Sequence, residues 1–428
     1  MNLFKIIKIS AAAKFVGLVS SFLISILIAN SLGQDRFGEY IFIISIITLA
    51  SIPVRAGTTI YISQFFFRNK TQSSRVNFLD MGYLFNLIYV VFLLALLLTF
   101  NVDLLIALIV FFIGLVYINK GFLRGIDKNY ISNIIDNGAR PFVYFILIIV
   151  VRQFSTNNST VSSVVSQFSI NDSTVSSVVS QFSINDSTVS SFMVLLFLSY
   201  VICSFFGIFE IKKYFGRFPD FQNGINFFHT SWVSGLLPFS AFQTIIIINA
   251  QLVIVISNYL LNSSQVAVIA IGLQFGLVSC FLTSILSNTV SKYLIIDNYD
   301  QSYVNKARLY NFIFGTLYLV FFIVFGKYIL TNLYGPDYVL SYYIALLLIV
   351  TYTLIHLIGP VTLFLNINKF SGFIIKTAVI SLLMTIILSF LLFDYIDSWS
   401  TVVASVISLL TLNLINYRKY RAVIKTTF

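Results

Sequence analysis

The sequence predicts an all-α membrane protein that crosses the bilayer about twelve times. Three observations lead to this fold class. The chain has 428 residues, of which 58% are hydrophobic and only 10% are charged, whereas soluble domains carry about 25% charged residues. Its apolar runs reach the roughly 20 residues that a spanning helix needs. The basic residues gather in every second loop between these runs. This pattern also indicates which loops face the cytoplasm.

The apolar runs define the expected helices in chain order. They are 10–31, 38–63, 80–100, 104–119, 139–152, 191–210, 232–258, 265–290, 310–331, 339–362, 371–393 and 399–416. The fifth is expected to be short. The apolar run 15–29 resembles a signal peptide, but many spans follow it, so we interpret it as an uncleaved first helix. An even number of spans places both termini on the same side of the membrane.

Twelve spans place 20 of the 26 Lys and Arg residues on one side. That side is interpreted as cytoplasmic, because basic residues are retained there in short loops. The 20 are Lys5, Lys8, Arg68, Lys70, Arg75, Lys120, Arg124, Lys128, Arg140, Lys212, Lys213, Arg217, Lys292, Lys306, Arg308, Lys369, Arg418, Lys419, Arg421 and Lys425. The opposite loops hold only Arg36 and Arg152.

The chain divides in the middle. Residues 1–211 form a predicted N-terminal lobe of six helices, 212–231 a polar cytoplasmic linker, and 232–428 a C-terminal lobe of six helices. Each half opens with two long apolar helices joined by a very short outer turn, as expected of transporters built from repeats.

An external loop is predicted at 153–190, between the fifth and sixth helices. The 14 residues 159–172 are repeated identically at 173–186. Alternating Val and Ser permit strands, whereas Ser, Asn and Asp favour a disordered or loosely turned loop. Identical copies indicate a recent duplication, and surface loops tolerate such added length.

Several functions are disfavoured by composition. The net charge of +11 comes from short clusters that flank apolar runs, so it does not indicate nucleic-acid binding. The only cysteines, Cys203 and Cys280, lie inside apolar runs and resemble small hydrophobic residues. No metal cluster, nucleophile–base pair or phosphate loop is evident, so we expect no metal, no cofactor and no enzymatic activity.

Four cationic residues lie at positions where burying a charge in the membrane is energetically unfavourable. Lys14, Arg55, Arg140 and Lys376 fall within predicted spans or at their edges. A cation near mid-membrane costs on the order of 2.5 to 3.5 kcal/mol on insertion scales. One interpretation is a basic pocket, open to the cytoplasm, for a pyrophosphate group. The alternative is that these side chains snorkel to the inner surface.

Arg55 is the deepest of the four, and Pro53 and Gly57 permit a kink beside it. Lys327, in the outer half of its span, is expected to snorkel outward.

Other polar residues in the spans leave alternatives open. Asn249 and Gln251 are predicted either to contact sugars or to hydrogen-bond between helices. His356 is either a proton relay or, as we favour, a packed neutral histidine. We expect no carboxylate deep in a span, which disfavours a cation-exporting antiporter.

Two turns carry a resemblance to a known family. Ser31-Leu32-Gly33-Gln34-Asp35-Arg36-Phe37-Gly38-Glu39-Tyr40, with its flanking helices, resembles the opening of bacterial O-antigen and polysaccharide flippases. Leu333-Tyr334-Gly335-Pro336-Asp337-Tyr338 is similar to a second turn of that family. The resemblance implies the fold of the multidrug/oligosaccharidyl-lipid/polysaccharide exporter superfamily, with two six-helix lobes in a V around a central cavity. Related flippases carry cations on the first two helices, which Lys14 and Arg55 match.

The same resemblance implies a function. We expect a flippase that moves undecaprenyl-pyrophosphate-linked oligosaccharide units across the bacterial inner membrane, with both termini cytoplasmic. Its partners would be this lipid-linked oligosaccharide, membrane lipids and possible polysaccharide polymerase and chain-length machinery. The alternatives are a multidrug antiporter of the same fold and a membrane polysaccharide polymerase. A polymerase would be expected to carry catalytic groups in a large outer loop, and the Ser/Val repeat speaks against it.

Overall fold

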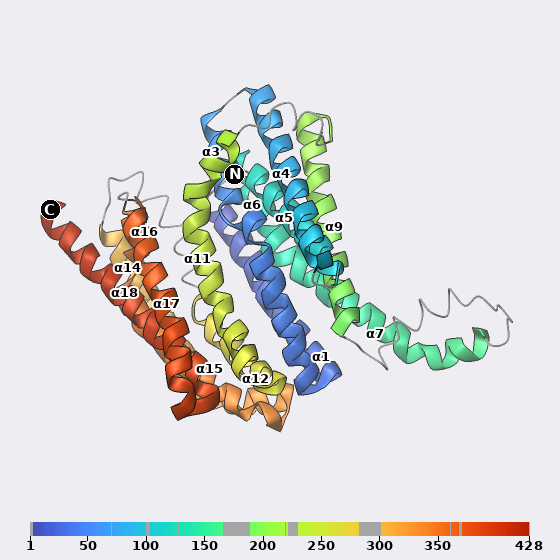
Figure 1. Ribbon diagram of the computed structural model, residues 1–428, viewed down its shortest axis with the longest axis vertical. Helices are drawn as coiled ribbons and strands as arrows, with labels where there is room; N and C mark the ends of the chain where they lie inside the picture. The colour runs from blue at the N-terminus through green and yellow to red at the C-terminus, as the bar shows by residue number, and fades with distance from the viewer. Residues whose placement is uncertain are drawn as a thin grey trace. The chain divides into compact units, whose positions relative to one another are not determined.

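A computed structural model describes residues 3–69, 71–99, 103–126, 128–165, 189–218, 220, 230–281, 301–359, 361–367 and 370–427. Within these ranges the chain consists of helices and turns and contains no strand (Figure 1). The predicted all-α fold class is therefore confirmed, because long apolar runs form helices that satisfy their own backbone hydrogen bonds in a bilayer.

The first predicted outer turn is present inside α1, Leu3–Ala50. Gly33 has φ 75° and separates two helical runs, a conformation that glycine adopts without steric cost. The predicted kink near Arg55 is also present. The short helix α2, Ile52–Arg55, is followed by Gly57 at φ 75°, and α3, Thr58–Arg68, then continues the path. Arg55 therefore ends a broken helix.

The next helices show where the predicted boundaries are wrong. They are α4, Gln72–Thr99; α5, Leu105–Gly125; α6, Asn129–Asn133; the π-helix η1, Ile134–Ala139; α7, Arg140–Val165; and α9, Val189–Phe215. The fifth span is not short, because α6, η1 and α7 form one helical path that begins ten residues before 139. The predicted loop likewise begins later than 153, since α7 extends to Val165. Residues 166–188 lie outside the described residues.

The second half contains longer helices and two turns. They are α11, Thr230–Leu260; α12, Ser263–Val278; α14, Gln301–Tyr334; the 3-10 helix η4, Pro336–Tyr338; α15, Val339–Ile358; α16, Val361–Ile367; α17, Ser371–Ile396; the 3-10 helix η5, Asp397–Trp399; and α18, Ser400–Thr427. The predicted helix 339–362 ends early at Gly359, where φ is 85°. The resembling turn 333–338 lies at Gly335 (φ 100°) and η4.

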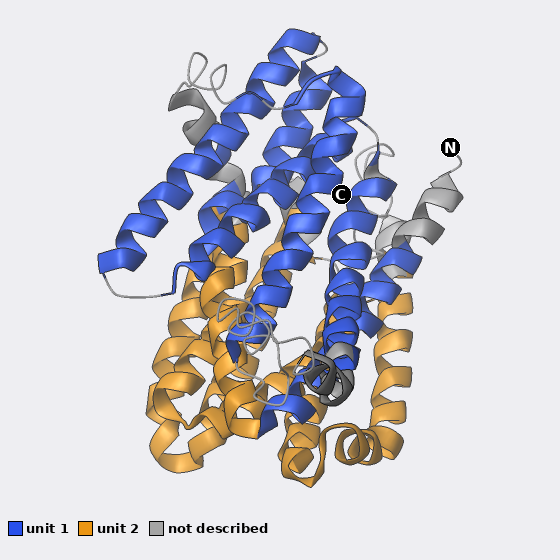
Figure 2. Ribbon diagram, turned by 90° about the vertical axis from the view of Figure 1, so that its right-hand side faces the viewer, with its two compact units in different colours: residues 1–33, 50–240 blue, residues 34–49, 241–428 orange. Residues whose placement is uncertain are grey.

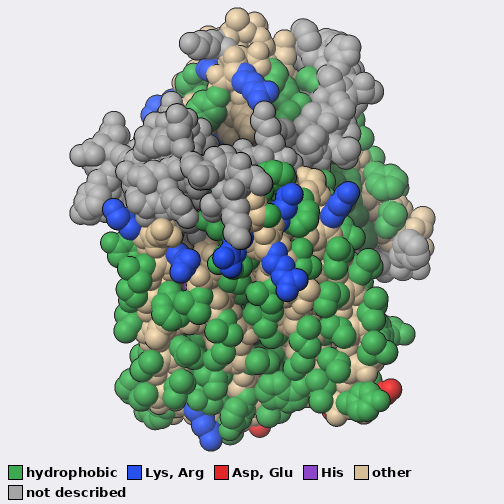
Figure 3. Space-filling view, turned by 90° about the vertical axis from the view of Figure 1, so that its left-hand side faces the viewer, with side chains coloured by type: hydrophobic (Ala, Val, Ile, Leu, Met, Phe, Trp, Pro, Cys, Tyr) green, Lys and Arg blue, Asp and Glu red, His purple; other side chains and the backbone are tan. Residues whose placement is uncertain are grey.

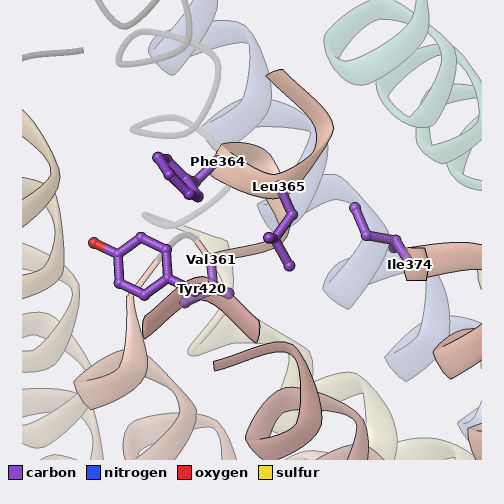
Figure 4. Packing of buried hydrophobic residues seen from close by; sticks show 5 residues of the cluster. All are labelled: Val361, Phe364, Leu365, Ile374 and Tyr420. Atoms are coloured by element: carbon purple, nitrogen blue, oxygen red, sulfur yellow. The ribbon is translucent and has the colours of Figure 1, made fainter. Parts of the chain in front are cut away.

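The short helix α16 is held by a small hydrophobic cluster. Val361, Phe364 and Leu365 pack with Ile374 of α17 and Tyr420 of α18 (Figure 4). The rings of Phe364 and Tyr420 meet edge to face, with centroids 4.8 Å apart. The polar end of α18 is thereby attached to the segment that joins α15 to α17.

The chain forms two compact units (Figure 2). Unit 1 contains Met1–Gly33 and Ala50–Ser240, and unit 2 contains Gln34–Leu49 and Ala241–Phe428. Each unit holds most of one predicted lobe, but 34–49 pack with the second half of the chain. In unit 1 α5 is central and packs against α3, α4 and α9. In unit 2 α15 packs against α12 and α14, and α17 packs against α18.

The helices are long and apolar enough to cross a membrane many times. Nine described segments qualify, and two of them, Ala11–Ala50 and Gly372–Val423, each contain a turn between two helices. Ser263–Val278 is a shorter apolar helix. On the face shown in Figure 3, hydrophobic side chains form a broad belt, and most of the visible Lys and Arg side chains gather toward one end of it. The protein is thus a multi-pass membrane protein.

A candidate anion-binding site in unit 1

The last turns of α5 carry three side chains of one face. Tyr117, Lys120 and Arg124 are spaced three and four residues apart, so they lie above one another on the helix. The apolar pattern predicts Lys120 and Arg124 in a loop, but α5 continues to Gly125. Both cations therefore belong to the end of a spanning helix and not to the loop after it.

The π-helix η1 brings a carboxylate to these cations. Asp136 forms an ion pair with Lys120, and the two side chains are only 7% and 12% exposed. Asn133 accepts a hydrogen bond from the guanidinium of Arg124 at 3.3 Å. Single-turn π segments in α-helices are often found at functional sites. Here the π turn directs Asp136 into the interior of unit 1, where it is buried.

Helix α1 approaches η1 closely enough to bring Lys14 near this pair. A Cβ added at Gly17 would lie 1.5 Å from the backbone oxygen of Asn137, so only glycine fits there. A Cβ added at Gly138 would lie 3.1 Å from the backbone oxygen of Ala13, a tight but less severe approach. Lys14, one turn before Gly17, consequently lies within range of the charges of Lys120, Arg124 and Asp136.

Arg55 and Arg140 complete the group from two further helices. The guanidinium carbon of Arg55 lies 5.0 Å from the centroid of the Tyr117 ring, and Lys120 Nζ lies 5.1 Å from the same ring. Arg140, at the start of α7, donates a hydrogen bond to the hydroxyl of Tyr200 on α9 and lies 4.9 Å from its ring centroid. Cations over aromatic faces are held without being neutralised.

We call Lys14, Arg55, Lys120, Arg124, Arg140 and Asp136 the cationic cluster. Five cations share one carboxylate, so the cluster carries a formal charge of +4 inside a single unit. Clustered cations repel one another, and partial burial weakens their screening by water. The cluster is therefore an electrostatically unbalanced site that an anion of two or more charges would stabilise.

The structure brings some of the predicted site residues together and places others elsewhere. Lys14, Arg55 and Arg140 are brought together. Lys376 lies on α17 in unit 2 with an exposed side chain, so its place in a pocket stays a prediction. Asn249 on α11 accepts a hydrogen bond from Thr385 of α17 at 3.4 Å. This bond matches the interhelical alternative for Asn249. Sugar contact by Asn249 or Gln251 stays a prediction.

Sequence reasoning missed Lys120, Arg124, Asp136 and the two tyrosines. The spacing of Tyr117, Lys120 and Arg124, which continues the apolar face before them, was the available signal. Asp136 is buried in unit 1 near the start of the candidate span Tyr130–Gln153, so the expectation that no carboxylate lies deep in a span stays a prediction. Asp80 of α4 is buried as well and accepts a hydrogen bond from Arg217 at 2.5 Å.

Two other observations concern the buried histidine and metal binding. His356 is buried and its Nε2 lies 3.1 Å from the backbone oxygen of Ser279, so the histidine is packed as expected, and the choice between a neutral histidine and a proton relay stays a prediction. In the described ranges no group of three or more His, Cys, Asp or Glu side chains could hold a metal ion. The cationic cluster is the strongest candidate site that the described residues offer.

Comparison with known proteins gives structural matches only. No protein-family model and no curated protein matches the chain. An inward-facing multidrug resistance MATE family transporter of the MOP superfamily matches with a TM-score of 0.67 at 11% identity, covering 98% of both chains. The lipid II flippase MurJ, in an inward closed conformation, matches with a TM-score of 0.68 at 13% identity over 98% of this chain and 93% of that one.

A third match is a MOP superfamily transporter from Pyrococcus furiosus Vc1 described by a reversed polarity of its binding pocket. Its TM-score is 0.60 at 12% identity, covering 98% of this chain and 96% of that one. These identities are too low to carry an activity across, but the coverage is nearly complete. The chain therefore has the fold shared by MATE family transporters of the MOP superfamily and the lipid II flippase MurJ.

Proposed function

We propose that this protein is a flippase for a lipid-linked oligosaccharide with a pyrophosphate head group. The specific substrate proposed is an undecaprenyl-pyrophosphate-linked O-antigen or capsular unit, moved from the cytoplasmic to the periplasmic leaflet of a bacterial inner membrane. The observation that supports the proposal most is the cationic cluster, in which five cations meet one carboxylate. The similar fold of a lipid II flippase supports the reaction class.

The chemistry of the cluster suits a pyrophosphate. Arg55, Arg124 and Arg140 offer planar forks that bind two oxygens at once, and Lys14 and Lys120 offer compact charges. A pyrophosphate diester carries two negative charges, which the +4 site more than offsets. Arg55 and Lys120 lie over the Tyr117 ring, and Arg140 lies near the Tyr200 ring and donates one hydrogen bond to its hydroxyl. These contacts leave further N–H donors of the three cations for a ligand.

Transport would proceed by alternating access. The head group would enter from the cytoplasm, with the sugars in a polar cavity and the lipid tail in the bilayer, and movement of the two halves would expose it outside. In this scheme Lys376 adds a cation and Asn249 and Gln251 contact sugar. Both termini are cytoplasmic, and a polysaccharide polymerase with its chain-length machinery receives the product. No covalent step is required.

The multidrug alternative has the same fold support but less support from the site. The MATE transporter matches about as well as MurJ does, so the fold does not choose between them. A cationic drug would meet a +4 cluster whose carboxylate is already paired with Lys120. Coulomb repulsion therefore disfavours cationic cargo at this site.

The proposal is tested by reconstituted flipping. A fluorescent polyprenyl diphosphate disaccharide is placed in proteoliposomes, and the fraction reached by an impermeant quencher is followed with time. Wild-type protein is expected to flip it, Arg55→Ala at least about tenfold more slowly, and Arg55→Lys at an intermediate rate.

Lys327→Ala is the matched control, because Lys327 is an exposed cation on α14. It is expected to flip at the wild-type rate. Equal rates for wild type and Arg55→Ala would refute the role of the cluster. Efflux of a cationic dye without any flipping would favour the multidrug alternative.

A further inference from the structure

One member of the cationic cluster has the wrong sign for binding an anion. Asp136 is buried on the π-helix η1 and is the one carboxylate that the described residues place among the five cations. A site that only had to attract a pyrophosphate would do so better without it. The α-helix is also distorted locally into a π turn at this residue. The carboxylate therefore needs a physical role of its own.

Asp136 holds the cation that is best placed to change partners. Its Oδ2 forms an ion pair with Lys120 Nζ. The carboxylate also interacts electrostatically with Arg140 and Arg55. Lys120 Nζ also makes a cation–π contact, because it lies 5.1 Å from the centroid of the Tyr117 ring. If a ligand draws Lys120 from Asp136, the ammonium group keeps that aromatic contact.

We propose that Asp136 is an internal counter-ion that competes with the pyrophosphate for the cationic cluster and so promotes its release. This inference rests on the proposed function and assigns a release role within the same site. In the empty site the carboxylate offsets part of the charge of Lys120, Arg55 and Arg140. A bound pyrophosphate displaces it from Lys120, and recovery of the Lys120–Asp136 pair helps to expel the head group. The residue thus lowers affinity in order to permit turnover.

The first experiment measures affinity. Farnesyl diphosphate is titrated into purified full-length protein in detergent, with farnesyl phosphate as the singly phosphorylated comparison. Asp136→Asn is expected to bind farnesyl diphosphate about tenfold more tightly than wild type, because a competing negative charge is removed. In the flipping assay the same variant is expected to show a lower KM and a lower maximal rate, as slow release requires.

A second background protects the test against misfolding, since Asp136→Asn leaves a buried lysine unpaired. Lys120→Gln keeps the carboxylate but removes its partner, so affinity is expected to fall by roughly a hundredfold. Lys120→Gln with Asp136→Asn is expected to recover at least about tenfold of that loss. A carboxylate that only stabilised the fold would give no recovery.

The matched control is another Lys–acid pair of unit 1. Lys128 Nζ lies 2.9 Å from Glu210 Oε2, outside the cationic cluster. Glu210→Gln removes the same type of charge and is expected to leave diphosphate affinity unchanged.

The outcomes separate the two proposals. If wild type neither binds farnesyl diphosphate nor flips the labelled lipid, the proposed function fails. If wild type does both, but removal of the Asp136 charge fails to raise affinity in either background, the counter-ion proposal is overturned while the flippase proposal stands. A KM that rises with the falling rate would also overturn it.

Discussion

The interiors of the two units differ in the kind of polar group that they bury. Among the described residues of unit 1 two carboxylates are buried, Asp80 and Asp136, each paired with a cation. Among the described residues of unit 2 the buried polar side chains are hydroxyls, amides and His356, with no Asp, Glu, Lys or Arg. The two units therefore differ in the polar groups that they bury: ion pairs in unit 1 and neutral hydrogen-bonding groups in unit 2.

The neutral interior of unit 2 follows a regular pattern on α17. Thr377, Ser381, Thr385 and Ser389 are spaced four residues apart and are all buried. Small hydroxyl residues on one helix face permit close helix packing in membranes, and their hydroxyls bond to backbone carbonyls of the same or a neighbouring helix. Ser381 donates to the backbone oxygen of Ser408 on α18 at 3.2 Å. Unit 2 is thus organised for packing, whereas the charges of unit 1 exceed what packing requires.

The largest expected loss of stability comes from unpairing a buried charge in unit 1. Asp80 is 2% exposed and pairs with Arg217, which is 36% exposed. Arg217→Leu should cost about 3 to 5 kcal/mol, because the carboxylate stays buried and unpaired. Asp80→Leu should cost less, about 1 to 2 kcal/mol, since the exposed guanidinium can reach water. Unfolding midpoints in detergent measure the difference, and equal losses would show that solvent access does not decide it.

Close helix approaches should matter equally in both units. A Cβ at Gly17 of unit 1 would lie 1.5 Å from the Asn137 oxygen, and one at Gly38 of unit 2 would lie 1.8 Å from the Ser263 oxygen. Gly17→Val and Gly38→Val should each destabilise by about 2 to 3 kcal/mol through overpacking. Only Gly17→Val should also weaken farnesyl diphosphate binding, because the contact at Gly17 places Lys14 of the same helix in the cationic cluster. Loss of binding in Gly38→Val would contradict this separation.

A single hydroxyl in unit 2 should contribute less. Ser257 of α11 and Thr401 of α18 form a buried hydrogen bond of 2.8 Å. Ser257→Ala should lower the free energy of unfolding by about 1 kcal/mol and leave diphosphate affinity unchanged. A loss as large as that of Arg217→Leu would mean that the neutral interior is as sensitive as the charged one.

The smallest effect is expected from the repeated segment. Deleting 173–186 removes one 14-residue copy. Stability should change by less than about 0.5 kcal/mol and the flipping rate should be unchanged, because added loop length has a small entropic cost. A measurable fall in flipping would give the repeat a role that its sequence does not indicate.

Much of the fold was predictable because long apolar runs leave the backbone no alternative to a helix in lipid. The turns at Gly33 and Gly335 and the break beside Arg55 were also visible as glycine or proline signals. Half of the cationic cluster, namely Lys120, Arg124 and Asp136, was not predictable as part of a site. Asp136 follows Asn133 and precedes Gly138, a pattern typical of a loop, but it is buried in a π turn where it pairs with Lys120 from another helix. Such tertiary compensation cannot be read from local propensity.

In the proposed function the cationic cluster of unit 1 binds a diphosphate head group. The most direct measurement is a calorimetric competition between farnesyl diphosphate and a cationic dye on purified protein, repeated with Arg140→Gln. We expect that the diphosphate binds, that farnesyl phosphate binds more weakly, that Arg140→Gln loses at least about tenfold in affinity, and that the dye does not compete. Tight dye binding with no diphosphate binding would contradict it.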